Sequence, residues 1–406
     1  MIGLSWLGRA LGSKHAETQR GTEVKGSRAA LGGPMVAFTG AGRAGWGASW
    51  GGRDAVTLAR EGYSRNAVAY RCVRLIAEAA ASVPWLLFEG RRETRAHPIL
   101  DLVGRPNPRE TGTAFMEAAH AHLLVSGNAY IEAVSLEGRP RELYGLRPDR
   151  MAVVPGEDGW PAAYDYGVGA RKVRLRQDGE GLRPILHLTL FDPADDHYGL
   201  SPMAAALSAL EIHNAAGAWN KALLDNAARP SGALVYAGPE GTRLTQGQFD
   251  RLKEELETNF QGAGNAGRPL LLEGGLDWKA LSLSPKDMDF VEARQAAARE
   301  IATAFGVPPM ILGIPGDATY ANYQEANRAF WRQTVVPMAT RTGRAMLAWL
   351  APAFEGAEGL TLELDLDRIE ALSPEREALW RRVEAASFLT EDEKREAVGY
   401  GLKERA

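Results

Sequence analysis

Three carboxylates near the C-terminal end of the chain have the spacing of a candidate metal site. Glu363, Asp365 and Asp367 alternate with leucines in the stretch LTLELDLD. If this stretch is a half-buried β-strand, the three side chains share one face, where they could hold Mg²⁺ for a nuclease. The leucines fill the other face. The same pattern is typical of an edge strand that has one buried face and one face exposed to solvent. A metal-dependent DNA-processing enzyme is therefore kept as the alternative function.

Other motifs contain residues that could bind a cofactor or a metal or act in catalysis, but each lacks the structural context that this chemistry needs. The run GAGNAG, residues 262–267, has the letters of a dinucleotide-binding loop, but it follows a predicted helix and precedes a predicted strand, the reverse of the required order. His120 and His122 are two apart on a predicted helix, whereas zinc pairs on helices need a spacing of i, i+4. The sequence has no P-loop and no nucleophile elbow, and Cys72 falls in an apolar stripe. We therefore predict no catalytic residue, no metal and no cofactor.

A glycine- and proline-rich loop between two helical patterns carries a different kind of polar group. In FGVPPMILGIPGDATYANYQE, residues 305–325, one helix is ended by Gly306, Pro308 and Pro309. The following stretch is kept irregular by glycines, and its polar side chains carry little net charge; the residues that define it are Gly313, Gly316, Asp317, Thr319, Tyr320 and Asn322. The pattern predicts a projecting contact surface that is mobile at its tip, with a new helix starting near residue 323.

Composition limits the classes of protein that this chain can belong to. Its 406 residues suffice for two or three compact units, and 45% hydrophobic with 24% charged residues is ordinary for a globular protein. The formal charge is −4 with both signs interspersed, unlike a conventional basic DNA-binding domain. The lone cysteine fits a reducing compartment, and no signal peptide or membrane-spanning run is predicted.

Hydrophobic periodicity and turn residues predict an α+β fold. Residues 1–59 are dense in glycine without a helical or strand period, which predicts a flexible arm. Helices and short strands alternate from there to residue 200, with one helix ending at Pro84, a second ending at Gly127 and a β-rich region over 141–191. A long alanine-rich helix then begins at Ser201, and it precedes a strand–helix–strand insert over 231–284. Helices are also predicted over 285–306, 323–351, 373–387 and 390–399, with a kink at Pro337.

Five phrases in this order resemble one family. They are HPILDLVGRPNP (97–108), LLVSGNAYIEAV (123–134), LHLTLFDPADDHYGLSPMAAA (186–206), LLLEGGLDWKALSLSPKDMDF (270–290) and EIATAFGVPPMILG (300–313). Together they are similar to the portal proteins of long-tailed bacteriophages, including those of phage-derived gene transfer agents. The match extends from about residue 60 to residue 352, and the glycine-rich arm and the short C-terminal part depart from it.

The resemblance implies a ring of about twelve subunits at one capsid vertex, with a channel through which double-stranded DNA is packaged and ejected irrespective of sequence. Carried onto this chain, the parts are a wing (60–200, with the strand near 361–367), a stem helix (201–230), a clip (231–284), a second stem helix (285–306), a tunnel loop (307–323), a kinked helix with the wing strand (324–372) and a reduced crown (373–406). The implied partners are the terminase large subunit, a head–tail adaptor and the major capsid protein, and no membrane. The implied location is the virion, after synthesis in the bacterial cytoplasm.

The same resemblance gives roles to particular residues. The loop residues from Gly313 to Asn322 would face the channel, with Gly306, Pro308 and Pro309 as the hinge. In the alanine-rich helix, Ala205, Ala209 and Ala216 would let stem helices of neighbouring subunits pack closely. A ring that conducts DNA also accounts for the mixed charge, because a basic patch would hold DNA at one position.

Overall fold

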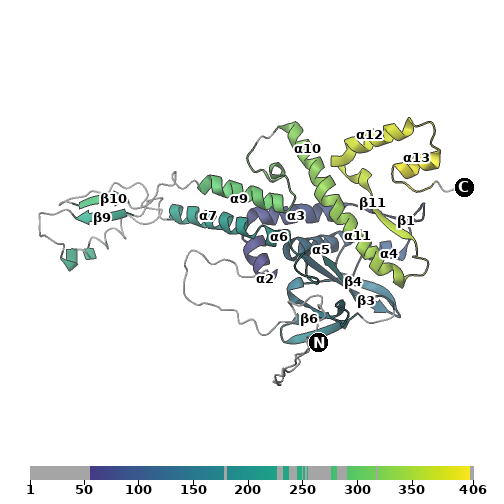
Figure 1. Cartoon of the computed structure of the whole chain (residues 1–406), viewed down its shortest axis with the longest axis horizontal. Coiled ribbons are helices and arrows are strands. Elements are labelled where there is room, and N and C mark those ends of the chain that lie inside the picture. Colours follow the sequence, from purple (N-terminus) through teal and green to yellow (C-terminus); the bar gives the residue numbers. More distant parts are fainter. Residues whose placement is uncertain are drawn as a thin grey trace, which may run out of the picture.

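The computed structural model describes most of the chain (Figure 1). The described residues are 55–177, 181–225, 232–236, 245–248, 250–251, 254, 276–280, 290–316 and 319–402. Several predicted features lie outside these ranges: the arm up to residue 54, the glycine run 262–267 and the loop residue Asp317. Within the described residues the fold mixes helices with small antiparallel sheets, as predicted.

The described chain begins with helices that belong to the folded unit. Ala55–Thr57 (α2) leads into a π-helical segment, Leu58–Tyr63 (η1), in which Leu58 is buried. The predicted end of the arm at residue 59 is therefore too late. The Asn66 side chain then caps the helix Ala67–Ser82 (α3) by accepting from two of its first backbone N–H groups, and this helix ends before Pro84 as predicted.

The first sheet joins segments from distant parts of the sequence. Trp85–Glu89 (β1) is its central strand, between Arg92–Thr94 (β2) and Leu360–Leu364 (β11). The last of these strands is shorter than predicted. Asp365 accepts from the N–H of Asp367 at 3.2 Å and caps the 3₁₀ turn Leu366–Arg368 (η7), so the strand ends at Leu364 and not at residue 367.

The second sheet packs against α5, the helix Gly112–Ser126. Its strand order is β4-β3-β8, and a short helix, α4, packs beside it; the bounds are Pro98–Gly104 (α4), Asn128–Leu136 (β3), Arg139–Leu146 (β4) and Ile185–Thr189 (β8). The helix α5 ends at Gly127 in the left-handed conformation (φ +77°), as predicted. A Cβ at Gly127 would lie 2.2 Å from the carbonyl oxygen of Gly199, so no larger residue fits.

The third sheet follows the 3₁₀ turn Pro148–Arg150 (η2) and has the order β5-β6-β7. Its strands are Met151–Pro155 (β5), Pro161–Val168 (β6) and Arg171–Arg176 (β7). One face of it packs on the second sheet through an aromatic cluster that includes Tyr130 and Tyr164, whose ring centroids are 5.8 Å apart. The predicted β-rich region between residues 141 and 191 is confirmed.

Two helices and a strand pair project from the rest of the chain. The alanine-rich helix is interrupted at Ala206, which separates Pro202–Ala205 (α6) from Leu207–Asp225 (α7). Phe290–Ala304 (α9) lies beside α7, and the antiparallel pair Gly232–Tyr236 (β9) and Leu276–Ala280 (β10) lies at the far end (Figure 1). Thr245 and Gln248 form a helix cap within the insert, because the Thr245 N–H donates to Gln248 Oε1 at 3.0 Å.

The long helix around Pro337 contains a π-helical segment. Tyr320–Phe330 (α10) continues through Trp331–Val335 (η5) into Val336–Leu350 (α11), and the 3₁₀ turn Ala351–Ala353 (η6) follows. Proline has no N–H to donate and stands in the first turn of α11, directly after the widened turns. The helix is therefore irregular beside Pro337, as a change of helix type, and the predicted kink stays a prediction.

The chain ends in two short helices that follow the 3₁₀ turn Glu370–Leu372 (η8). They are Ser373–Glu384 (α12) and Glu391–Ala397 (α13), each slightly shorter than predicted. Thr390 and Glu393 form a reciprocal capping box at the start of α13.

Buried apolar side chains form separate clusters in the described part of the chain. The largest joins α3, α7, α9 and η5, and it includes Cys72, where burial raises the thiol pKa to about 12. A second lies between α11, α5 and the first two sheets, and the third is the aromatic cluster under β5 and β6. None of the helices in the described residues is both long enough and apolar enough to cross a membrane.

Candidate DNA-channel loop and helical stem

The base of the predicted tunnel loop is fixed to the π-helical segment. Gly306 has a left-handed φ of +67°, and its carbonyl accepts from the Thr334 hydroxyl at 2.7 Å. A Cβ on Gly306 would lie 2.8 Å from Thr334 Oγ1. The end of α9 and the segment η5 are thus held together at the point where the loop begins.

The first half of the loop packs on the subunit itself. Val307 is buried, and Pro308 precedes a 3₁₀ turn, Pro309–Leu312 (η4), whose Ile311 and Leu312 pack against the largest apolar cluster. The turn ends at Gly313 in the left-handed conformation, with φ +73°. The projecting part therefore starts at Gly313, and Pro308 and Pro309 form a rigid platform for it.

The tip of the loop is exposed but attached at one point. Gly313, Pro315 and Gly316 are exposed, and the carbonyl of Pro315 accepts from the Arg299 guanidinium on α9 at 2.5 Å. Apart from Asp317, which lies outside the described residues, the chain from Gly306 to Gln324 contains no charged side chain.

The far side of the predicted loop is helical. Thr319 caps α10 by accepting from the N–H of Asn322 at 3.2 Å, so Tyr320 and Asn322 lie in the first turn of the helix. The prediction that places them in an irregular tip is wrong, because the Thr319 hydroxyl starts the helix earlier than residue 323. Both side chains remain at the surface, and Tyr320 is 78% exposed. The Tyr320 hydroxyl accepts from Gln324 Nε2 at 3.1 Å.

The stem alanines divide into two groups. Ala209 and Ala216 on α7 are 3% and 5% exposed, buried within their own subunit, whereas Ala205 at the end of α6 is exposed. The predicted packing of Ala209 and Ala216 against a neighbouring subunit therefore needs correction, because this chain already covers them. The exposed face continues from Ala205 along α7 through Ser208, Ile212 and Ala215, and Ile212 is 48% exposed.

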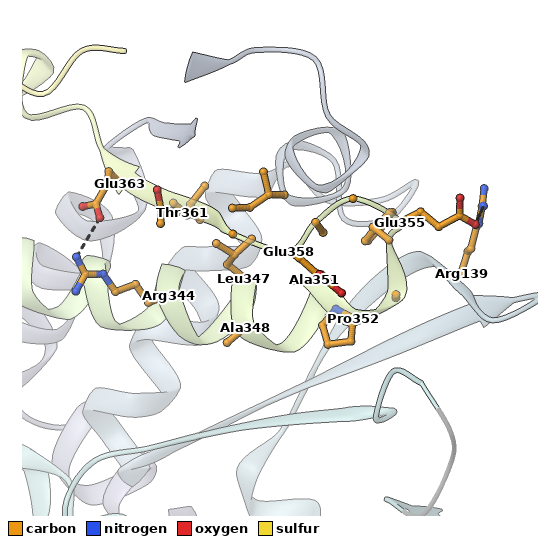
Figure 2. A pocket seen from close by; sticks show the side chains of 17 residues that line it. Arg139, Arg344, Leu347, Ala348, Ala351, Pro352, Glu355, Glu358, Thr361 and Glu363 are labelled. Carbon is orange, nitrogen blue, oxygen red and sulfur yellow. Dashed lines mark hydrogen bonds and ion pairs between the residues drawn. The ribbon is translucent and has the colours of Figure 1, made fainter. Parts of the chain in front are cut away.

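The three carboxylates of the alternative nuclease hypothesis border a common pocket, but each pairs with a different arginine and they do not form a metal site. Glu363 pairs with Arg344 at 3.0 Å beside a cavity of about 850 Å³ between α11 and β11 (Figure 2). Asp365 lies 3.7 Å from the Arg368 guanidinium and caps η7. Asp367 accepts from Arg376 at 2.5 Å and from the Tyr400 hydroxyl at 2.7 Å, and the bond from Arg376 chiefly lowers its pKa.

This separation follows from the end of β11. Because the strand stops at Leu364, the alternation that would put the three carboxylates on one face is broken before Asp365. Among the described residues no group of three His, Cys, Asp or Glu side chains has the geometry to hold a metal ion. The pair His120 and His122 on α5 is no exception, since burial of His120 lowers its pKa to about 4 and neither of its ring nitrogens has a hydrogen-bond partner in the described structure.

The contacts that anchor the loop were not predicted from the sequence. Thr334 and Arg299 hold its base and its tip, and Thr334 is 28 positions from Gly306 in the chain. A threonine inside a helical pattern carries no local sign of such a contact. Gly306, Pro308 and Pro309 were the only local signals. They predict that the chain turns here, but they do not predict which side chains hold the turn.

Comparison with known proteins identifies the family. The model of the phage portal protein family matches residues 67–399. The chain belongs to the phage portal protein family. This confirms the resemblance seen in the five phrases, and it places the chain among structural proteins instead of enzymes.

The chain is also similar to individual proteins over most of its length. A chain in the neck of an empty gene transfer agent (GTA) particle, computed with C6 symmetry, is 56% identical, with a TM-score of 0.69 over 87% of this chain and 95% of that one. A chain in the neck of a native GTA particle, computed with C12 symmetry, is 54% identical, with a TM-score of 0.67 and the same coverage. An uncharacterized protein of Rickettsia bellii is 40% identical over 354 residues, which are 86% of this chain and 91% of that protein.

Proposed function

We propose that copies of this chain form a closed ring in the neck of a phage or GTA particle, and that double-stranded DNA passes through its centre. The observation that carries the proposal is the 56% identity, over 87% of this chain, to a chain of a GTA particle neck. The C12 symmetry of a related neck supports a ring of about twelve subunits. The terminase large subunit, a head–tail adaptor and the major capsid protein are the proposed partners of this ring.

The parts of the subunit are assigned by their place in the chain. The three sheets with α3, α4, α5 and α11 form the wing, and α6, α7 and α9 form the stem. The clip is assigned to residues 231–284, and its strands β9 and β10 lie at the far end of the stem (Figure 1). The helices α12 and α13 form the crown. The association of β11 with β1 supports one wing built from both halves of the chain.

The loop after α9 is the proposed DNA contact. Each Lys or Arg that neutralises a phosphate releases about one counterion and strengthens binding at that position. A translocation channel has to let DNA move past every position, so deep free-energy wells are unfavourable. The residues of the tip include neither Lys nor Arg, and the Arg299 guanidinium that reaches the tip from α9 is hydrogen-bonded to the Pro315 carbonyl. The start of α10 offers the exposed Tyr320 hydroxyl and the Asn322 amide. These groups suit weak, sequence-independent contacts.

The test of the loop separates assembly from DNA handling. Asp317, Tyr320 and Asn322 are replaced together by alanine, and Phe191→Ala, an exposed aromatic residue (82% exposed) outside the loop, is the control. We expect native mass spectrometry and negative-stain images to show intact rings for both proteins. We also expect a loss of nuclease-protected DNA per particle for the triple variant alone.

Two outcomes would contradict this proposal. Purified chain that stays monomeric at all concentrations, with no ring in images, would refute the ring. Triple-variant particles that protect as much DNA as the wild type would leave the ring standing but remove the loop from the channel.

A further inference from the structure

The outer strand of the third sheet concentrates positive charge. β7 has the sequence RKVRLR, with its cations at Arg171, Lys172, Arg174 and Arg176. Five of its six residues are exposed, Leu175 being the exception. Val173 is 44% exposed, so the strand also presents apolar surface.

The backbone of β7 has hydrogen-bonding groups that point away from the sheet. The N–H of Gln177 donates to the carbonyl of Ala162 at 2.8 Å, and the register places Arg176 opposite Ala163. Bonded and non-bonded pairs alternate in an antiparallel ladder, so residues 171, 173 and 175 bond to β6. The N–H and C=O groups of Lys172, Arg174 and Arg176 then point outward, and no other strand in the described structure pairs with β7.

The opposite edge of the same sheet is closed. On β5, the outward-pointing N–H of Val153 donates to the Tyr198 hydroxyl at 2.8 Å, and Val153 is buried. The two edges therefore differ: a side chain of the subunit covers one, while the other is exposed and cationic.

One buried carboxylate binds two of the four cations and leaves the strand with a net positive charge. Asp165 on β6 is 5% exposed and lies 3.0 Å from Lys172 Nζ and 2.7 Å from Arg174 Nε. These partners, chiefly the hydrogen bond from Arg174, lower its pKa to about 2, so it stays ionised. Lys172 and Arg174 nevertheless remain 65% and 56% exposed, and four cations against one carboxylate leave a positive surplus.

We propose that β7 is a docking edge for an extended, acidic segment of a partner protein, which adds to the third sheet as a fourth strand. Its backbone pairs with the outward groups of Lys172, Arg174 and Arg176, and its acidic side chains lie on the face that these residues share. The residues between them lie on the face of Val173. The fitting segment therefore alternates acidic with apolar residues, and the surface is separate from the proposed channel.

Charge and geometry favour this occupant over two others. Charged side chains on an edge strand protect it from pairing with another copy, and a second β7 would bring cation opposite cation. The phosphates of double-stranded DNA would use the charges and could accept from the outward N–H groups, but they carry no donor for the outward C=O groups. An acidic strand satisfies both.

The test uses the full chain and a short end-capped peptide in which glutamate and valine alternate, with binding followed by fluorescence anisotropy. A peptide of the same sequence, N-methylated at the residues that would pair with β7, keeps the charge and loses the backbone donors. We expect it to bind at least about tenfold more weakly, as the loss of backbone hydrogen bonds requires.

A matched pair of variants separates backbone from charge in the protein. Arg176→Pro removes an outward N–H and the charge, without removing a bond to β6, whereas Arg176→Gln removes the charge alone. We expect the proline variant to bind the peptide about tenfold more weakly than the glutamine variant. If the proline variant fails to fold, the two peptides on the wild-type protein decide the question.

Three results would overturn the proposal. Equal binding of the two peptides, or of the two variants, would mean that charge alone holds the peptide. A DNA duplex that displaces the peptide and binds Arg176→Pro and Arg176→Gln alike would make the strand a nucleic-acid surface. A change in oligomer mass caused by Arg176→Pro in the free protein would make a second copy the occupant.

Discussion

Three glycines in the loop between α9 and α10 are under different constraints. Gly306 combines a left-handed φ of +67° with a close approach to Thr334 Oγ1, whereas Gly313 has a left-handed φ of +73° with open space around it. Gly316 lacks a left-handed φ, and a Cβ added there would meet no atom within 4 Å. Substitutions at these three glycines can therefore separate the cost of the left-handed backbone from the cost of the close contact with Thr334.

Alanine substitutions at these positions should therefore rank in order. Gly313→Ala should cost about 1–2 kcal/mol for the left-handed backbone, and Gly306→Ala should cost more, because the Thr334 hydroxyl must move away from the Gly306 carbonyl as well. Gly316→Ala should change the free energy of unfolding by less than about 0.5 kcal/mol. Urea denaturation of the three variants checks the ranking, and equal losses at positions 306 and 316 would contradict the geometry of the hinge.

A buried histidine should make the stability depend on pH. Burial lowers the pKa of His120 from 6.5 to about 4, so the unfolded chain binds a proton on this side chain at a higher pH than the folded chain does. The stability that the buried, neutral His120 contributes to the free energy of unfolding is fully present above pH 6.5 and is lost as the pH falls towards about 4. His120→Leu should remove this dependence, and its free energy of unfolding should fall less between pH 7 and pH 5 than that of the wild type, by up to about 1.4 kcal/mol per pH unit. Parallel slopes for the two proteins in chemical denaturation would show that His120 is not buried in its neutral form.

At the scale of elements, local signals predicted where helices begin and end. Gly127 and Pro84 stop α5 and α3 where expected, because a left-handed turn and a missing donor act within a few residues. The errors arose where a side chain competes with a continuing pattern. Asp365 ends β11 although the alternation of leucines continues, and Thr319 starts α10 although glycines precede it.

Pairings between distant segments could not be derived from periodicity. The contact of β11 with β1 joins residues near 362 to residues near 87, and the Thr334 and Arg299 anchors of the loop likewise depend on tertiary packing. The resemblance to a family assigned the strand near 361–367 to the same part as residues 60–200, but it did not name the strand with which it pairs, and it gave no sign of the two anchors of the loop. The π-helical form of the disruption near Pro337 also needed the structure, because proline predicts a break without its type.

The contact between α11 and the first sheet depends on the absence of a side chain at Gly343. A Cβ there would lie 2.0 Å from the Trp85 ring, so Gly343→Ala should destabilise the subunit by about 1–3 kcal/mol through overpacking, although alanine favours helices. A Cβ added at Gly217, in α7, would have nothing within 4 Å, and Gly217→Ala should stabilise by up to about 1 kcal/mol. Thermal denaturation of the monomeric subunit measures both. Stabilisation by both substitutions would mean that Trp85 moves aside without cost.

In the whole subunit, the helices α6, α7 and α9 of the proposed stem have an inner and an outer face. Ala209 and Ala216 on α7 are buried inside the subunit, and α9, which packs beside α7, also buries small residues, including Ala297 and Ala302. The outer face leaves Ile212 48% exposed, and Val291 on α9 is 64% exposed. Apolar side chains that a single subunit leaves in water are the ones that a neighbouring subunit of the ring can cover.

Leucine substitutions on the two faces should therefore fail in different ways. Ala209→Leu adds volume to a site that is 3% exposed, so the subunit itself should lose about 1–3 kcal/mol of stability, which denaturation of the monomer measures. Ala205→Leu adds volume at an exposed position, so the monomer should melt as the wild type does, while the proposed contact between subunits is overpacked at every interface of the ring. Native mass spectrometry should then show fewer closed rings for Ala205→Leu at unchanged monomer stability. Rings of Ala205→Leu that form and melt like the wild type would place α6 away from the interface, and a monomer equally destabilised by both substitutions would mean that the two faces are not distinct.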